Sequence, residues 1–212
     1  MKKVLITLPN HDIATYYISS WSKEIIKEAE KRNISTLKLE GNKANRKNLI
    51  SFLEKQDPGF IILNGHGDEN SIYGYKEEVL IKVGDEEMLR NKIIYTIACD
   101  AAKSLGESIV EKGGKCFIGY KDKFVFFMDE RKVTKPLNDD KAASFFNPAN
   151  LVPISIIKGN KTIESVEKAR DAFKKEIIKW RMSKELETIF MVSALLHDFS
   201  SLTHLGKNSS FE

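Results

Sequence analysis

Phe60-Ile61-Ile62-Leu63 leads into Asn64-Gly65-His66-Gly67, and Ile93-Ile94-Tyr95-Thr96-Ile97-Ala98 leads into Cys99. Both apolar runs are short, rich in branched residues and apolar on both alternating faces. That pattern is typical of a strand buried on both sides within a parallel sheet. We therefore predict two buried strands, each of which delivers a chemically capable side chain, His66 or Cys99, at its carboxyl end.

The two strand ends are expected to meet. In a parallel sheet the carboxyl ends of all strands lie at one edge, and ligand crevices in open α/β sheets lie outside that edge. Neighbouring strands are about 4.8 Å apart, so His66 and Cys99 should face one crevice, as a thiol nucleophile with a histidine base requires. The alternatives are a structural cysteine buried in a strand and a histidine that is only a polar member of a Gly-rich turn.

The segments around these strands predict a β-α-β-α-β order with right-handed crossovers. The expected fold is α/β with three layers: a mainly parallel sheet of strand order 2-1-3-4-5 and helices on both faces. A flavodoxin-like fold shares this topology but needs a phosphate-binding loop after the first strand, where this chain has no glycine. The predicted strands are 4–8, 35–39, 60–63, 93–98 and 115–120, and the predicted helices are 12–32, 45–55 and 101–112.

The remaining segments predict a hairpin and a helical extension. The hairpin falls within 71–91, and the apolar run 124–128 either closes the sheet or forms a loop. Further helices are predicted at 141–146, 149–157, 162–182 and 184–205. We expect one domain over 1–212, with the sheet core in 1–135 and a helical C-terminal part in 136–212.

Composition is that of an ordinary globular protein. The 212 residues are 42% hydrophobic and 30% charged, and 34 basic and 30 acidic residues are interspersed. No sustained basic block suggests nucleic acid, and no apolar stretch approaches the 18 residues that a membrane span needs. The apolar run 4–8 is too short for a signal peptide, so we expect a cytoplasmic protein. Its two cysteines are expected to be reduced thiols, with Cys116 structural.

An apolar block that ends in His-Gly, followed by one that ends in Ala-Cys, resembles the signature of the caspase-like (clan CD) cysteine peptidases. This group includes caspases, metacaspases, gingipains, clostripain and CHAT-domain proteins. The matching segments are 60–67 and 93–99, and 106–114 with 115–120 look like the helix and strand that follow the cysteine in prokaryotic members. The resemblance covers roughly 1–180 and is closest to prokaryotic CHAT and gingipain-like domains.

The resemblance implies a caspase-like fold and a cysteine endopeptidase that hydrolyses protein or peptide substrates through a His66/Cys99 dyad and an acyl-enzyme. It implies that His66 acts chiefly as the acid that protonates the leaving amine. It also implies an oxyanion hole formed by the backbone amides of Gly67 and Cys99. A helix beginning at Ala101 would lower the thiol pKa through its dipole.

Substrate preference stays open. Metacaspases and clostripain-like enzymes carry Asp two residues before the cysteine, where this chain has Ile97, and no counterpart of the arginine-lined caspase pocket stands out. Asp12 and Asp122 follow strands at the functional edge and are candidates to bind a basic substrate side chain, although each also fits a helix cap or a surface charge.

Neither a cofactor nor a metal is expected. His66 and Asp68 supply only two ligands, fewer than a zinc site needs. His197-Asp198 is half of a metal-hydrolase motif and is interpreted as a solvated helix end, while His11 is either a groove or a loop residue. The alternative function is a catalytically silent caspase-like domain that binds a regulatory protein partner.

Overall fold

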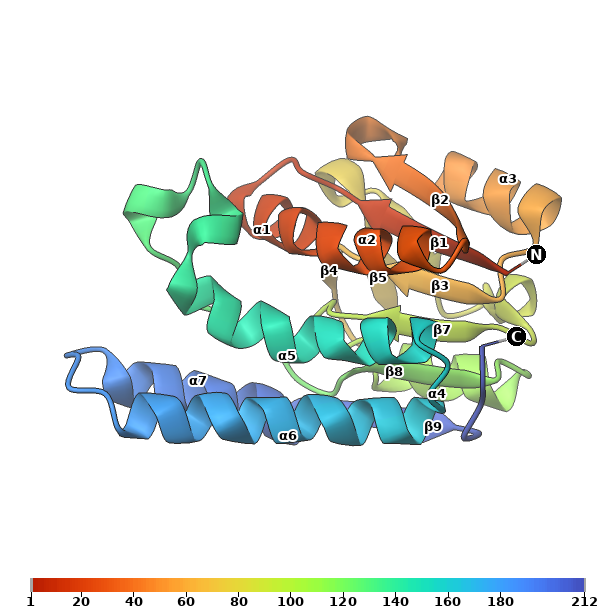
Figure 1. Cartoon of the computed structure of the whole chain (residues 1–212). Helices are drawn as coiled ribbons and strands as arrows, with labels where there is room; N and C mark the ends of the chain where they lie inside the picture. Colours follow the sequence, from red (N-terminus) through yellow and green to blue (C-terminus); the bar gives the residue numbers. More distant parts are fainter. Residues whose placement is uncertain (1, 212) are drawn as a thin grey trace.

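A computed structural model describes residues 2–211 as an α/β protein with a mainly parallel six-stranded sheet (Figure 1). The strand order is β2-β1-β3-β7-β8-β9, which confirms the predicted order of the first five strands. β9 is antiparallel to β8 and was not predicted. The strands are β1 (Lys3–Leu8), β2 (Ser35–Glu40), β3 (Phe60–Leu63), β7 (Ile93–Thr96), β8 (Cys116–Tyr120) and β9 (Leu202–Gly206).

The central strands end level with one another. β3 and β7 pair in parallel from Phe60 opposite Ile93 to Leu63 opposite Thr96. The Thr96 hydroxyl then donates to the Leu63 carbonyl at 2.6 Å. Just beyond β3, the Asn64 amide donates to the Thr7 hydroxyl of β1 at 2.7 Å. These bonds hold the ends of β1, β3 and β7 together at the edge where the candidate site lies.

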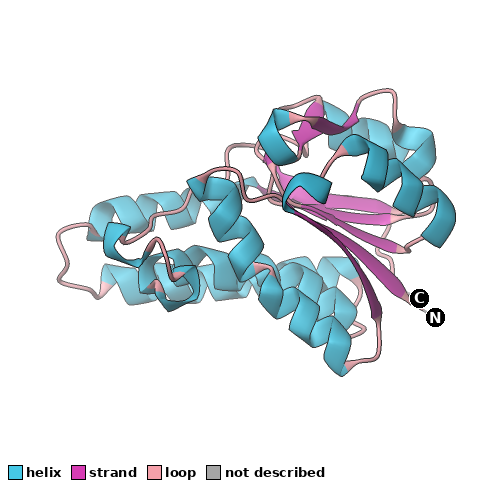
Figure 2. Cartoon of the chain, turned by 90° about the horizontal axis from the view of Figure 1, so that it is seen from above, coloured by secondary structure: helices cyan, strands magenta, loops and turns pink. Residues whose placement is uncertain are grey.

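One face of the sheet is covered by α1 (Ile13–Trp21), α2 (Lys23–Lys31) and the C-terminal helices, which share a single hydrophobic core (Figures 1 and 2). A single helix over 12–32 was expected, but the chain breaks at Ser22. The Ser22 hydroxyl donates to the Ile18 carbonyl at 2.8 Å and accepts from the Asn64 side chain. Serine back-bonding of this kind favours a bend in a helix.

The other face is covered by α3 (Arg46–Gln56), α4 (Ser104–Glu111) and a small antiparallel sheet, around a second hydrophobic core. Helices on both faces were predicted and are confirmed. The small sheet has the order β4-β5-β6 and contains the predicted hairpin. Its strands are β4 (His66–Gly67), β5 (Ser71–Tyr73) and β6 (Val79–Lys82).

The C-terminal part contains α5 (Asp140–Ile157), α6 (Thr162–Arg181) and α7 (Thr188–Ser201). Two helices were predicted where α5 is continuous, with Pro148 and Pro153 inside it. The helix predicted to reach residue 205 instead ends at Ser201, and the following residues pair with β8 because that strand would otherwise be an unpaired edge. Residues 124–128 form a loop and do not close the sheet.

Short 3-10 turns connect these elements. They are η1 (Gly41–Lys43), η2 (Tyr75–Glu77), η3 (Glu86–Leu89), η4 (Glu130–Lys132) and η5 (Pro136–Asn138). Within residues 2–211, none of the helices combines the length and the apolar composition that a membrane-spanning segment requires.

Candidate functional site

His66 is turned out of the main sheet into the small sheet by Gly65. The Gly65 backbone has a φ of +151°, and a Cβ at this position would lie 1.8 Å from the Tyr73 carbonyl oxygen. Only glycine therefore permits the close approach between the end of β3 and β5. The imidazole of His66 is placed at the carboxyl edge of the sheet by this turn.

Gly67 brings the histidine segment against the cysteine segment. A Cβ at Gly67 would lie 2.8 Å from the Ala98 Cβ and 2.8 Å from the Cys99 carbonyl oxygen. The segments that follow β3 and β7, which the sequence predicts to meet, therefore approach each other closely at Gly67 and Cys99. No hydrogen bond joins the His66 ring to the Cys99 thiol among the residues that the structure describes.

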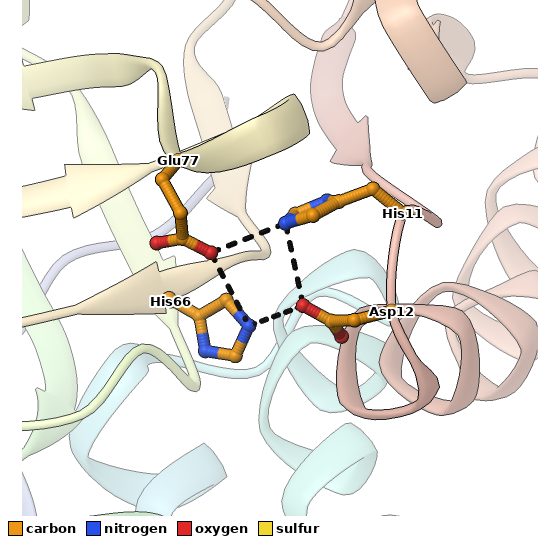
Figure 3. Close-up of side chains that lie close together, drawn as sticks. All are labelled: His11, Asp12, His66 and Glu77. Carbon is orange, nitrogen blue, oxygen red and sulfur yellow. Dashed lines mark hydrogen bonds and ion pairs between the residues drawn. The ribbon is translucent and has the colours of Figure 1, made fainter.

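The imidazole of His66 is held by Asp12. Its Nε2 lies 2.7 Å from Asp12 Oδ2 (Figure 3), while Asp12 Oδ1 accepts from the Thr15 amide at 2.8 Å and so caps α1. Burial alone would raise the pKa of Asp12, but hydrogen bonds from the Thr15 amide and from His66 outweigh it and leave this pKa below its usual value. The ionised carboxylate of Asp12, which also caps α1, therefore orients the imidazole of His66.

His11 and Glu77 complete a cluster around this pair (Figure 3). His11 Nε2 lies 3.1 Å from Glu77 Oε1 and 3.3 Å from Asp12 Oδ2, and Glu77 Oε1 lies 3.7 Å from His66 Nε2. The His11 ring packs edge-on against Tyr75, with centroids 5.5 Å apart. Four metal-ligating groups thus converge, their ligand atoms all within 4.8 Å of one another.

Asp68 takes no part in this cluster. Its Oδ2 accepts from the Tyr73 hydroxyl at 2.6 Å, and its Oδ1 accepts from the Asn70 amide at 2.7 Å. The carboxylate beside His66 is therefore supplied by Asp12, the N-cap of α1 in the loop after β1, and Asp68 instead orders the turn of the small sheet.

Cys99 follows β7 and is half-buried. Burial raises the pKa of its thiol, and the nearby backbone amide of Phe124 lowers it by less. The expected lowering by a helix dipole is wrong because α4 begins at Ser104. Before that helix, the amides of Asp100 and Ala102 donate to the carbonyls of Asp122 and Tyr120, at 3.2 and 3.1 Å, so the chain first runs beside the end of β8.

The backbone around the thiol retains a free donor. The Cys99 amide donates to no acceptor within residues 2–211, whereas the next amide, that of Asp100, is occupied. Asp100 has a φ of +60°, which turns the chain sharply after the cysteine. The two amides expected in an oxyanion hole, those of Gly67 and Cys99, therefore belong to segments in contact, and that of Cys99 is unoccupied.

The two aspartates expected to bind a basic side chain differ. Both carboxylate oxygens of Asp12 are engaged, one by the α1 cap and one by His66, so Asp12 is not an open acceptor. Asp122 is exposed, and its backbone carbonyl accepts from the Asp100 amide beside the thiol. A hydrogen bond from the Lys123 amide lowers the pKa of Asp122. Of the two, only Asp122 is available to a substrate.

Two further expectations concern buried groups. Cys116 is fully buried, and burial raises its pKa to about 12, as suits a structural thiol. The solvated helix end expected at His197-Asp198 is wrong for Asp198, which is fully buried where α7 contacts the loop at Lys123 and Val125. Its Oδ1 accepts from the Val125 amide at 3.0 Å.

No protein-family model and no curated protein matches this chain.

Proposed function

We propose that this chain is a caspase-like cysteine endopeptidase in which His66 and Cys99 form the catalytic dyad. The close approach of Gly67 to Ala98 and Cys99 carries the proposal, since it supports an imidazole and a thiol at one sheet edge, in the segments that follow the adjacent parallel strands β3 and β7. Geometry of this kind is the first requirement for a nucleophile and its base.

Asp12 sets the tautomer of the histidine. An ionised carboxylate accepts a hydrogen bond but cannot donate one, so Asp12 Oδ2 keeps the proton of a neutral His66 on Nε2. Nδ1 then carries the lone pair and is the nitrogen available to the thiol. Asp12 is therefore a positioning residue that prepares His66 as a base.

The reaction proceeds through an acyl-enzyme. The Cys99 sulfur attacks the peptide carbonyl carbon, and the thiol proton passes to His66 Nδ1. The amides of Gly67 and Cys99 stabilise the oxyanion, a contribution of about 3 kcal/mol for each donor. His66 returns the proton to the leaving amine as the C–N bond breaks, and water then hydrolyses the thioester.

The raised pKa of Cys99 favours the neutral thiol in the resting chain. A neutral thiol needs a base at the moment of attack, so His66 must remove a proton as well as supply one. This assigns a larger role to His66 than the resemblance implies.

A catalytically silent binding domain is the second candidate. The absence of a His66–Cys99 hydrogen bond within the described residues and the raised thiol pKa favour it. The turn before α7 and its first residues also expose large apolar side chains: Leu186 is 99% exposed, Ile189 72% and Phe190 62%. Such a surface fits a protein partner.

Cleavage of a diverse fluorogenic peptide library decides between the two functions. We expect turnover that Cys99→Ala and His66→Ala each abolish and that Cys116→Ala retains per folded molecule. Cleavage that persists in Cys99→Ala would contradict the dyad. A protein partner bound equally by the wild type and Cys99→Ala, with no peptide cleaved, would favour the binding domain.

A further inference from the structure

We propose that His11, Asp12, His66 and Glu77 form a binding site for a divalent transition-metal ion, with Zn²⁺ as the best fit. Two imidazole nitrogens and two carboxylate oxygens converge at one point (Figure 3). They come from three separate segments: the loop after β1, β4 and η2. Imidazole with carboxylate is a ligand set that Zn²⁺ accepts in tetrahedral geometry.

The spacing of the ligand atoms fits a tetrahedral ion. Zinc lies about 2.0–2.2 Å from such ligands, which places the ligands about 3.3–3.6 Å from one another. The Asp12 oxygen lies 2.7 Å from His66 Nε2 and 3.3 Å from His11 Nε2. The Glu77 oxygen lies 3.1 Å from His11 Nε2 and 3.7 Å from His66 Nε2. Three of these four distances lie within about 0.2 Å of the tetrahedral range, and the Asp12 and His66 ligand atoms would separate by about 0.6 Å to seat the ion.

The charge balance also favours a cation. In the described part of the chain no lysine or arginine forms an ion pair with Asp12 or Glu77, whose only ionic partners are the two histidines. The two carboxylate oxygens lie within 4.8 Å of each other. Like charges this close repel one another. A divalent ion between the two carboxylates would attract both, and this attraction would outweigh their mutual repulsion. Two imidazoles in the set disfavour Mg²⁺ and Ca²⁺, which prefer oxygen ligands.

Binding should be reversible. Histidines that bind zinc usually donate the second ring nitrogen to an acceptor, and loss of that partner weakens binding about 10–100-fold. His11 Nδ1 is buried and has no hydrogen-bond partner. We therefore expect an affinity below that of a structural zinc site.

Metal binding would switch off the dyad, a consequence that rests on the proposed function. The ion occupies Nε2 of His66, and a neutral imidazole bound through Nε2 carries its proton on Nδ1. Nδ1 is the nitrogen that must accept the Cys99 proton. The ion therefore converts the base into a donor and blocks attack by the thiol.

Isothermal titration calorimetry with ZnCl₂ on the reduced, chelator-treated chain tests the site. We expect one ion per chain, bound at least tenfold more weakly by Glu77→Gln, whose half-exposed side chain can be changed without disturbing the core, and by His11→Ala. Cys99→Ala and His197→Ala remove other side chains that can bind Zn²⁺, a thiol and an imidazole, and should bind the ion as the wild type does. Wild-type affinity in both Glu77→Gln and His11→Ala, or no binding by the wild type, would overturn the site.

Inhibition separates the two proposals. Zn²⁺ should inhibit peptide cleavage, with an inhibition constant at least tenfold higher in Glu77→Gln. Binding at the cluster by a chain that cleaves no peptide would support the metal site and overturn the peptidase alone. Cleavage that proceeds unchanged with the site saturated would overturn the inhibitory effect of the ion.

Discussion

Asp198 is a buried carboxyl group that the proposed mechanism does not use. Its side chain is fully buried, its Oδ1 accepts one backbone hydrogen bond, and its Oδ2 has no partner. Burial raises the pKa of Asp198 well above the usual carboxyl value. The group is therefore held as a neutral acid behind the loop that runs past Cys99.

Asp198→Asn should stabilise the chain at neutral pH. The folded-state pKa lies above the unfolded value, so the contribution of Asp198 to stability is complete below the unfolded pKa and is lost as the pH rises toward the folded pKa. Asparagine removes this loss, with a gain on the order of 1 kcal/mol. Urea unfolding at pH 4 and pH 7 measures the difference in unfolding free energy between the wild type and the variant. Asp122→Asn, at an exposed position, is the control. A wild type whose Asp198-dependent stability rises between these pH values would contradict the burial argument.

Asp12→Asn should separate catalysis from stability. Asparagine is a good helix N-cap, so α1 should keep its cap and the melting temperature should change little. The side-chain amide, however, can donate to His66 Nε2 and so favour the wrong tautomer. We expect kcat to fall about 10²–10⁴-fold, while Asp171→Asn, at an exposed position on α6, retains activity. Equal activity in the two variants would show that Asp12 only caps the helix.

At the scale of elements, the small β4-β5-β6 sheet presses the histidine segment against the cysteine segment. Gly67→Ala places a methyl group 2.8 Å from both the Ala98 Cβ and the Cys99 carbonyl oxygen. Overpacking of this kind costs about 1–3 kcal/mol, and it should also lower kcat by separating the two strand ends. Gly84→Ala meets no atom within 4 Å and strains only its own backbone. Denaturation and peptide turnover of both variants provide the check: Gly67→Ala with unchanged kcat would mean that this contact does not position the dyad.

The elements that the sequence predicts well are those with an uninterrupted local signal. β3 and β7 are continuous apolar runs rich in branched residues. A polar segment that contains His66 follows the first run, and Cys99 follows the second. The predicted elements are wrong where a contact with a residue distant in the sequence determines the local structure. The helix breaks at Ser22, whose hydroxyl donates to the Ile18 carbonyl and accepts from the distant Asn64 side chain, and β9 is a strand because β8 needs a partner. Such pairings are long-range, so local periodicity does not reveal them.

The same distinction explains the candidate site. Asp12 was selected because it follows β1 at the functional edge, and the edge rule could have promoted its neighbour His11 in the same way. Glu77 offers no such signal. It lies in a turn where Lys76 and Glu77 have φ values of +54° and +61°, and its approach to His66 depends on how the hairpin folds back. Its role is therefore found only in three dimensions.

At the scale of the whole molecule, the sheet separates two hydrophobic cores. Phe211, close to the C-terminus, packs into one of them. Phe211 is buried against Phe60, with ring centroids 5.7 Å apart, and its carbonyl accepts from the Lys2 ammonium group at 2.8 Å. Phe60 begins β3, at the end opposite His66. The stabilising Phe211 contact and the proposed catalytic site therefore lie at opposite ends of the same strand.

Phe211→Ala should reduce stability without changing the site. Loss of a buried phenylalanine ring costs about 3–5 kcal/mol, whereas Leu186→Ala, at a position 99% exposed, should cost little. Chemical denaturation gives the difference, and kcat per folded molecule should stay at the wild-type value in both. A fall in kcat for Phe211→Ala that exceeds the loss of folded chain would mean that the terminus influences the dyad.

The pairing of His66 with Cys99 is tested most directly by the rate of iodoacetamide alkylation at each cysteine, followed by mass spectrometry from pH 6 to pH 10. This measurement needs no knowledge of the substrate. Both thiols have a raised pKa, but Cys116 is fully buried and its pKa is raised to about 12. We expect Cys99 to be labelled first, more slowly than an ordinary free thiol at neutral pH and faster as the pH rises, with a lower rate at neutral pH in His66→Ala. Labelling of Cys116 first, or a Cys99 rate that His66→Ala leaves unchanged, would contradict the dyad.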